Sequence, residues 1–430
     1  MNDHRSAKTN QRVVARILAA ALLLAGVVWL FLTAAEDDTK RLFFGQWRLR
    51  HLGIALAAFY IGTLCFLASR SRRALFAAMF ATVLALMTLG ITEISGLLGI
   101  VSFPRVFGRV TADTWQDRVV PNLDMKGQTV QDLAYALRYP TEPIAFHYVT
   151  DRRGFRNAED RNDADIYLVG DSILVAGLLP FEATMTSLLE RDLGVRTMNI
   201  AIAGLAVQEE RDLFKAAKLP LDHRLVLQFV YEGNDLLDSV RYRNPHSVEP
   251  KPLLQSTFTY NVLMSLMDRS DTRNSVNERR TGRINGTEFL FGRTNHSYRG
   301  ADEEYKYICE ALLDMRATIT SAGGSYAIVF VPEKIRVLGT SCEFPPESSL
   351  RDYDKNLSPM RLWMFDWCHK QGIPMLDLTD ALIDSTRSGA VPWFPADSHP
   401  DGVGHRVSAD AIKTWDVVTS WINAQRERVR

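Results

Sequence analysis

The chain has 430 residues, of which 47% are hydrophobic and 23% charged, and its 50 basic residues are matched by 50 acidic ones. This composition excludes a disordered tail protein, a collagen-like chain and a disulfide-dense miniprotein, because each of these classes is strongly biased. The lack of a basic excess also argues against a protein that binds the nucleic-acid backbone, so no nucleic-acid partner is expected.

The first hundred residues differ sharply from the rest. Three runs without charged residues, at 17–35, 52–69 and 74–92, are each long enough to cross a hydrocarbon core of about 30 Å. Residues 1–104 are therefore predicted to form a membrane region with three transmembrane helices.

Lys and Arg indicate orientation, because they accumulate on the cytoplasmic side of a membrane. The N-terminal tail and the link between the second and third runs are both basic, although the loop between the first two runs is basic as well. The prediction is a multi-pass protein of the cell membrane whose C-terminal domain is extracytoplasmic, either periplasmic or at the cell surface. If residues 1–35 are instead a cleaved signal peptide, with Thr33 and Ala35 at the cleavage site, the large domain lies on the same side.

Cysteines add little. Cys65 falls in a predicted span, and the soluble part holds Cys309, Cys342 and Cys368. An odd number permits at most one intramolecular disulfide there, and the sequence does not say which pair would form it.

After the membrane region, residues 105–163 are irregular and polar and are predicted to be a connector, with a turn in the stretch 151–157. Residues 164–430 then alternate between strand and helix patterns. The expected strands are 166–169, 196–202, 225–231, 326–331 and 374–378. The expected helices are 184–193, 208–217, 303–319, 358–371 and 406–423. Such alternation predicts an α/β domain with a parallel sheet between helices.

An insertion at about 238–301 interrupts this alternation. It is rich in arginine, with Arg269, Arg273, Arg279, Arg280, Arg283, Arg293 and Arg299. Because charge runs usually face water, we expect a solvated surface excursion. If the insertion binds a ligand, an anionic or polyhydroxylated polymer of the cell envelope is the expected one.

Polar residues follow the expected strands at the points where parallel sheets place their chemistry. Ser172 comes after the first strand, Gly204 after the second and Asn234 after the third, and Asp397 and His399 lie in the last loop. A nucleophilic serine needs a base, a residue that orients the base, and hydrogen-bond donors for the oxyanion. The chain supplies a candidate for each of these roles.

These blocks resemble the SGNH hydrolases, also called GDSL-type esterases and lipases, over about residues 151–424. The blocks are VGDSILVAG around Ser172, NIAIAGLAVQE around Gly204, VYEGNDLLD around Asn234 and ADSHPDGVGH around His399. The preceding TDRRGFRN, residues 150–157, is similar to the lead-in of membrane-anchored and envelope members. The resemblance implies a flavodoxin-like three-layer sandwich with a parallel five-stranded sheet.

The resemblance also implies roles. Ser172 would attack an ester carbonyl, His399 would accept its proton, and Asp397 would orient the imidazole. The N–H groups of Ser172 and Gly204 and the side-chain amide of Asn234 would hold the oxyanion.

Asp171 is expected to fix the turn. Two positions depart from the family pattern. Glu232 stands where a glycine is frequent, and Ala396 stands three residues before the histidine, where the acid is frequent. Asp397 is two residues before the histidine, a spacing also seen in acetyltransferase-like relatives.

The predicted function is a membrane-anchored extracytoplasmic serine hydrolase that cleaves an ester, with O-acyl groups on an envelope polysaccharide or glycolipid as the expected substrate. An O-acyltransferase acting on an envelope polysaccharide, with acyl groups supplied by a membrane partner protein, and a catalytically silent binding module on the same scaffold are the alternatives. No cofactor is implied. A metal site at Asp401 and His405 is not favoured, because no second cluster has metal-ligand spacing.

Overall fold

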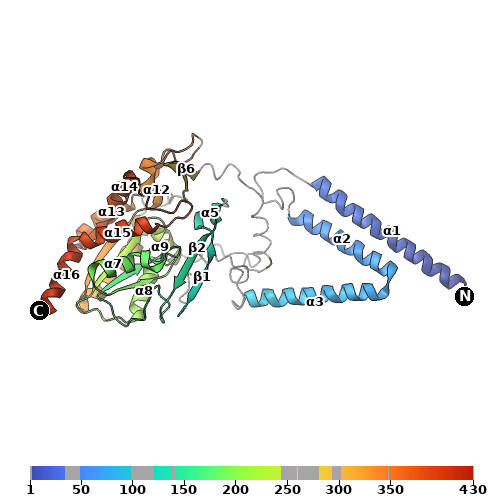
Figure 1. Ribbon diagram of the computed structural model, residues 1–430, viewed down its shortest axis with the longest axis horizontal. Coiled ribbons are helices and arrows are strands. Elements are labelled where there is room, and N and C mark those ends of the chain that lie inside the picture. Colours follow the sequence, from blue (N-terminus) through green and yellow to red (C-terminus); the bar gives the residue numbers. More distant parts are fainter. Residues whose placement is uncertain are drawn as a thin grey trace. The chain divides into compact units, whose positions relative to one another are not determined.

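A computed structural model of the chain describes residues 2–33, 49–97, 121–137, 139, 141–243, 259, 280–292, 302–346 and 348–429. The chain divides into two compact units (Figure 1). One contains the three N-terminal helices and the other contains every described strand.

The N-terminal unit is built from helices α1 (Asn2–Thr33), α2 (Leu49–Arg70) and α3 (Arg72–Leu97). Each is long and apolar enough to span a membrane, over Gln11–Thr33, His51–Arg70 and Arg72–Ile94 respectively. Large hydrophobic side chains are exposed along all three helices, which would be unfavourable in water but not in lipid. The predicted spans fall within these helices, except that residues 34 and 35 lie outside the described residues.

The second unit contains a parallel five-stranded sheet in the order β4-β3-β5-β8-β9. The strands are β3 (Ile166–Gly170), β4 (Thr197–Ala201), β5 (Leu225–Tyr231), β8 (Ser325–Val331) and β9 (Met375–Asp377). Numbered along the chain, this order is 2-1-3-4-5, the flavodoxin-like arrangement, in which strand order reverses between β3 and β5. The predicted α/β class and the five-stranded parallel sheet are confirmed.

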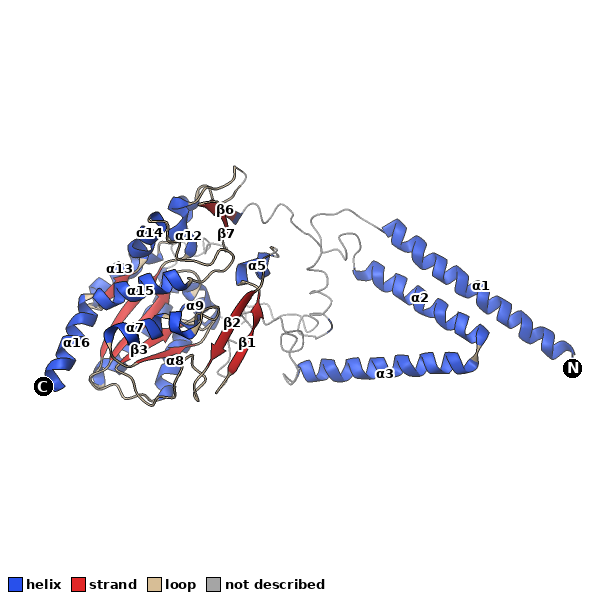
Figure 2. Cartoon of the chain, viewed as in Figure 1, coloured by secondary structure: helices blue, strands red, loops and turns tan. Residues whose placement is uncertain are grey.

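Helices cover both faces of this sheet (Figure 2). On one face, Ile166 and Leu168 pack with residues of α7 (Met185–Leu193), α12 (Lys334–Leu338), α14 (Thr379–Arg387), α15 (Gly402–Thr414) and α16 (Asp416–Val429). On the other face, Tyr167 and Val169 pack with residues of α8 (Val207–Ala217), α9 (Asp235–Arg243), α11 (Asp302–Ser321) and α13 (Met360–Gln371). Successive side chains of a strand alternate between the two faces of the sheet, so the sheet contributes to a hydrophobic core on each face. The result is three layers, with the sheet between two layers of helices.

Glycines end two of the described helices by a local rule. Gly194 and Gly372 end α7 and α13 in the left-handed conformation, with φ of 66° and 64°, as glycines commonly do. The predicted closing helix 406–423 is wrong as a single element. Trp415 adopts an extended conformation with ψ of 132° and separates α15 from α16.

The described part of the predicted connector is more regular than expected. It forms β1 (Asp124–Thr129), α5 (Asp132–Leu137) and β2 (Ile144–Val149), with β1 and β2 paired antiparallel.

The insertion also contains regular structure. A hairpin joins β6 (Thr281–Ile284) to β7 (Thr287–Leu290), and its Phe289 and Leu290 are buried. This part of the insertion is therefore core rather than a solvated excursion. Arg269, Arg273, Arg279, Arg293 and Arg299 lie outside the described residues. All four cysteines are free thiols in this structure.

Candidate active site

The proposed nucleophile stands in a tight turn directly after β3. Asp171 caps the short helix α6 (Ser172–Val175), because its Oδ1 accepts the Ile173 N–H at 3.0 Å. The half-buried Ser172 hydroxyl donates to Asp171 Oδ2 at 3.3 Å. The turn thus presents a partly accessible hydroxyl at the carboxyl edge of the sheet.

Arg156 binds the backbone that follows this turn. Its side chain is buried, and its guanidinium donates to the backbone carbonyls of Val175, Ala176 and Leu179. It also lies over the ring of Tyr148, 4.9 Å from the ring centroid. Burial lowers the pKa of Arg156 to about 10, so the group is still charged at neutral pH. Arg156 of the TDRRGFRN stretch therefore holds the chain that follows Ser172.

Asn234 follows β5, the strand that lies beside β3 in the sheet. Its Nδ2 donates to Asp238 Oδ2 at 2.7 Å and to Asp171 Oδ2 at 3.3 Å. The Asp171 carboxylate therefore binds both Ser172 and Asn234, so the structure brings these two predicted site residues together. Gly204 follows β4 with φ of +76°, and a Cβ atom there would meet nothing within 4 Å. Its backbone is thus open to a ligand on that side.

The unusual Glu232-Gly233 pair has a structural explanation. The buried Glu232 carboxylate forms a two-pronged ion pair with Arg336, whose Nε lies 2.7 and 3.0 Å from its two oxygens. A Cβ atom on Gly233 would come within 2.4 Å of the Tyr231 ring, so only glycine fits there.

The last loop pairs His399 with Asp397. The imidazole Nδ1 and Asp397 Oδ1 are 2.6 Å apart, and the same oxygen accepts the backbone N–H of His399 at 3.0 Å. The other oxygen, Oδ2, accepts the backbone N–H of Asp132 at 2.9 Å. Asp397 is only 1% exposed. Three N–H groups therefore bind a carboxylate that is shielded from water.

This pairing shifts both acid–base equilibria. Burial alone would raise the pKa of Asp397, but the charge of His399 and the hydrogen bonds hold it below its usual range. Burial alone would lower the pKa of His399, but the nearby carboxylates of Asp397, Asp132 and Asp171 raise it to about 10. The placement of the two loops rests on contacts: the Ser172 turn follows β3, and the Tyr231 hydroxyl at the end of the neighbouring β5 donates to the Ser398 carbonyl.

Buried donors hold the histidine loop in place. Lys334 Nζ donates to the carbonyls of Phe394, Pro395 and Asp397 at 2.8 to 2.9 Å. Tyr231, at the end of β5, donates to the Ser398 carbonyl at 3.4 Å. In this structure the Ser172 hydroxyl points to Asp171.

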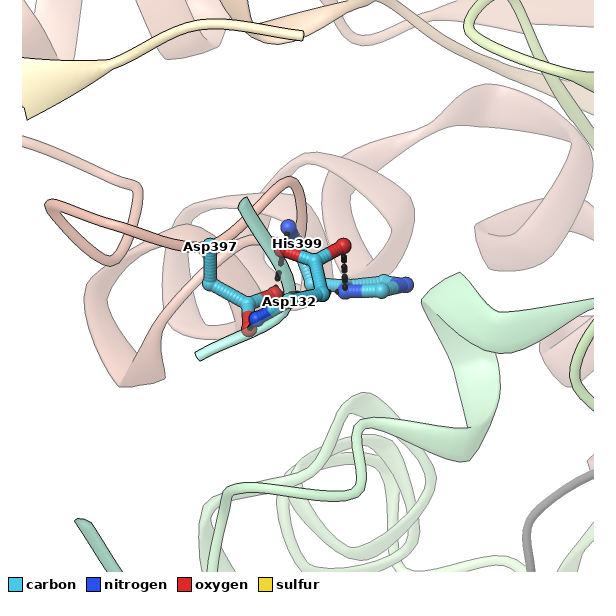
Figure 3. A group of neighbouring side chains, drawn as sticks. All are labelled: Asp132, Asp397 and His399. Atoms are coloured by element: carbon cyan, nitrogen blue, oxygen red, sulfur yellow. Dashed lines mark hydrogen bonds and ion pairs between the residues drawn. The ribbon is translucent and has the colours of Figure 1, made fainter. Parts of the chain in front are cut away.

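Asp132, Asp397 and His399 form a close group, and their donor atoms lie within 4.8 Å of one another (Figure 3). Such a group could hold a metal by proximity alone. However, the 2.6 Å separation between Nδ1 and Oδ1 is that of a hydrogen bond, which occupies the nitrogen that a metal would need. The residues fit a proton-bearing pair better than a metal centre.

Asp401 and His405 are used in the fold. Asp401 caps α15, accepting the N–H groups of Val403 and Gly404 at 2.9 and 3.1 Å. His405 Nδ1 accepts the Met185 N–H at 3.1 Å, and burial lowers the pKa of His405 to about 3.

Sequence reasoning missed three residues that shape this site: Asp132, Lys334 and Arg156. Arg156 lies in a stretch that the motif comparison had already singled out. The other two carry no local signal, because their partners lie far away in the chain.

Comparisons with known proteins add little. No protein-family model matches the chain, and no curated protein does either. Among solved structures, the chain is similar to one described provisionally as a lipolytic protein of the G-D-S-L family from Desulfitobacterium hafniense DCB-2. That likeness has 13% identity and a TM-score of 0.31, and it covers 57% of this chain and 95% of the other. At these values it does not identify the family of this chain.

Proposed function

We propose that the chain is a membrane-anchored serine esterase whose nucleophile is Ser172, with His399 as base and Asp397 as the residue that orients it. The observation that carries the proposal is the buried Asp397 carboxylate, which binds the imidazole Nδ1 at 2.6 Å. In the neutral imidazole, a proton on Nδ1 leaves the lone pair of Nε2 available to accept a proton from a serine. Because the nearby carboxylates raise the pKa of His399 to about 10, this neutral form is the minor one at pH 7, and we expect the reaction rate to rise with pH towards that pKa.

The reaction would proceed in two halves. Ser172 Oγ forms a bond to the carbonyl carbon of the ester while its proton moves to His399 Nε2, and the carbonyl oxygen becomes an oxyanion. The tetrahedral intermediate then expels the alcohol, which takes the proton from His399, and the acyl group remains on Ser172. Water repeats these steps and releases a carboxylic acid and free Ser172.

Three donors would hold the oxyanion: the N–H of Ser172, the N–H of Gly204 and Nδ2 of Asn234. Removing one such donor typically costs about 2.7 to 4 kcal/mol of transition-state stabilisation. In the structure Asn234 Nδ2 is shared with Asp238 and Asp171. We propose that an oxyanion replaces the longer of these two bonds, that to Asp171, when substrate binds.

The substrate and its location form part of the same proposal. Three spans with basic residues before the first and between the second and third would place the catalytic unit outside the cytoplasm. An ester on an envelope polysaccharide or glycolipid is the substrate class that this location favours. The same acyl-enzyme could instead pass its acyl group to a sugar hydroxyl, with a membrane partner protein as acyl donor.

The test is labelling of the full-length chain in detergent by a fluorescent fluorophosphonate. Wild-type protein should be labelled and Ser172→Ala should not. Ser388→Ala is the matched control, because its exposed hydroxyl donates to the Ser385 carbonyl and belongs to no proposed part of the site. Loss of labelling in Ser388→Ala, or labelling that persists in folded Ser172→Ala, would overturn the assignment.

If wild-type protein is labelled, adding an acetylated donor ester and an oligosaccharide acceptor separates hydrolysis from transfer. Free acetate as the product supports the esterase. An acetylated oligosaccharide supports the transferase. A folded wild-type chain that is not labelled at all would favour the silent binding module.

A further inference from the structure

Asp132 makes a set of contacts with the histidine loop that its place in the sequence does not suggest. It starts α5, 265 residues before Asp397, and its backbone N–H donates to Asp397 Oδ2 at 2.9 Å. Its side-chain Oδ1 accepts the backbone N–H of Ser398 at 2.7 Å, and its Oδ2 accepts the Ser398 hydroxyl. Its Oδ2 is also 3.7 Å from His399 Nδ1. One residue thus contacts all three residues of the Asp-Ser-His sequence (Figure 3 shows two of these contacts).

Backbone pairing reinforces this contact. The N–H of Ala396 donates to Gln131 Oε1, and its carbonyl accepts the N–H of Ala134, both at 3.0 Å. Leu133, Ala134, Leu290 and Ala396 form a small buried cluster beside these bonds. The start of α5 is therefore fastened to the loop by polar and apolar contacts together.

We propose that Asp132 is a positioning residue for His399, so that α5 is a structural part of the active site rather than a connector. Its backbone holds Asp397 and its carboxylate holds Ser398 in the conformation that presents the imidazole. The same carboxylate places a second negative charge beside the ring. The proposal rests on the proposed function for its catalytic meaning, but its contacts are independent of it.

The charge has a measurable consequence, because a carboxylate within about 4 to 6 Å stabilises a protonated imidazole. Among the described residues, the charges of Asp397, Asp132 and Asp171 act on His399, and His405 lies close enough to interact with it. Lys334 and Tyr231 contact the carbonyls of Asp397 and Ser398 in the same loop. The three carboxylates act in the same direction, and they outweigh the burial of the ring. His405 is buried and neutral at physiological pH, and Lys334 is held by loop carbonyls. Removing the Asp132 charge should therefore lower the pKa of His399.

The experiment measures that pKa directly in the full-length chain. Protein with ¹³C-labelled histidine rings in detergent is titrated by NMR, and the His399 signal is assigned with His399→Gln. Asp132→Asn keeps an oxygen for the Ser398 N–H but loses the charge, so it should fold. We expect it to lower the pKa of His399 by about 1 to 2 units, within the range for a single nearby charge. Asp124→Asn, an exposed carboxylate on the adjacent β1 that pairs with His147, is the matched control and should leave the His399 signal unmoved.

A second readout follows reaction at Ser172. The rate of fluorophosphonate labelling is measured against pH, and its acid limb should move to lower pH in Asp132→Asn by the same amount. Asp132→Glu retains the charge on a longer side chain. It should bring the pKa of His399 back close to its wild-type value, but it should bring the labelling rate back only in part.

The outcomes separate the two proposals. An unmoved His399 titration in folded Asp132→Asn overturns the role of Asp132, even if the labelling rate falls at every pH, because a merely structural contact predicts that result. A shifted titration in a chain whose wild type is never labelled upholds the Asp132 contact and overturns the esterase.

Discussion

Replacing Asp397 by asparagine tests the proposed mechanism most sharply, because the two side chains have nearly the same shape. Three N–H donors converge on the carboxylate: Nδ1 and the backbone N–H of His399 on Oδ1, and the backbone N–H of Asp132 on Oδ2. An amide offers only one oxygen and adds an NH2 group. At least one of these donors must therefore face another donor in Asp397→Asn.

Neither orientation of the amide preserves the site. If its oxygen faces His399, the NH2 group opposes the Asp132 N–H, and a buried donor is left unsatisfied at a cost of about 1 to 3 kcal/mol in stability. If its oxygen faces Asp132, the NH2 group faces Nδ1 and favours the imidazole tautomer with its proton on Nε2. That tautomer cannot accept the serine proton. In both cases the negative charge that stabilises the imidazolium is lost.

The corresponding substitution in serine-protease triads lowers kcat by about 10⁴-fold, which is about 5 kcal/mol in activation free energy. Because the first orientation retains the correct tautomer, we expect a loss of about 10³ to 10⁴-fold here. The assay is hydrolysis of a p-nitrophenyl ester by the full-length chain in detergent, with thermal unfolding as a check on folding.

Asp401→Asn is the matched control. Asp401 lies in the same loop and also accepts backbone N–H groups, but it caps a helix, and asparagine caps helices about as well as aspartate. It should retain kcat within about threefold, since caps of similar strength are exchanged. A folded Asp397→Asn that keeps more than about a tenth of the wild-type kcat would refute the orienting role, since that role is worth far more.

Three further predictions concern other parts of the site. Asn234→Ala should lower kcat by about 10² to 10³-fold with little change in KM, whereas the exposed Asn162→Ala should not; equal effects on ester hydrolysis would contradict the oxyanion role. Because the pKa of His405 falls to about 3 in the folded chain, the unfolded chain binds more protons below pH 6.5, so stability should decrease as pH falls from about 6.5 to 3. His405→Gln should weaken that decrease in thermal unfolding, and an unchanged slope would count against the buried neutral ring. Arg156→Met should lower the unfolding temperature, because three buried carbonyls lose a donor at about 1 to 3 kcal/mol each, partly offset by no longer burying a charge; an unchanged temperature would contradict this.

Local patterns account for much of the fold. The strand predicted at 225–231 has those same limits in the structure, because seven buried residues in a row leave few alternatives to a central parallel strand. The hairpin between β6 and β7 was missed although Asn285-Gly286 carries its signal. Both residues have positive φ, at 51° and 79°, as a two-residue hairpin turn requires. Arg280 and Arg283 near this turn favour a solvated segment by their charge, whereas the turn residues favour a hairpin.

The site was predictable where its parts lie close to strand ends or in a recognisable motif. Ser172 and Asn234 follow β3 and β5 within a few residues, so sequence position and topology together imply their proximity, whereas Asp397 and His399 were predicted from the motif that contains them. Asp132 offers no such route, because a contact across 265 residues is made by tertiary packing alone.

The spacing of Asp397 shows why that packing matters. With the acid two residues before the histidine, Oδ1 can accept both the backbone N–H and Nδ1 of His399 in one local turn, as aspartates do in turns. The second oxygen then faces away from the histidine and needs a donor from elsewhere in the chain. The backbone N–H of Asp132 is that donor, and Ala396 is fastened to the same helix start by Gln131 and Ala134. The short spacing therefore lets one Asp397 oxygen bind His399, and the distant α5 segment binds the other oxygen, so both are needed to hold the imidazole.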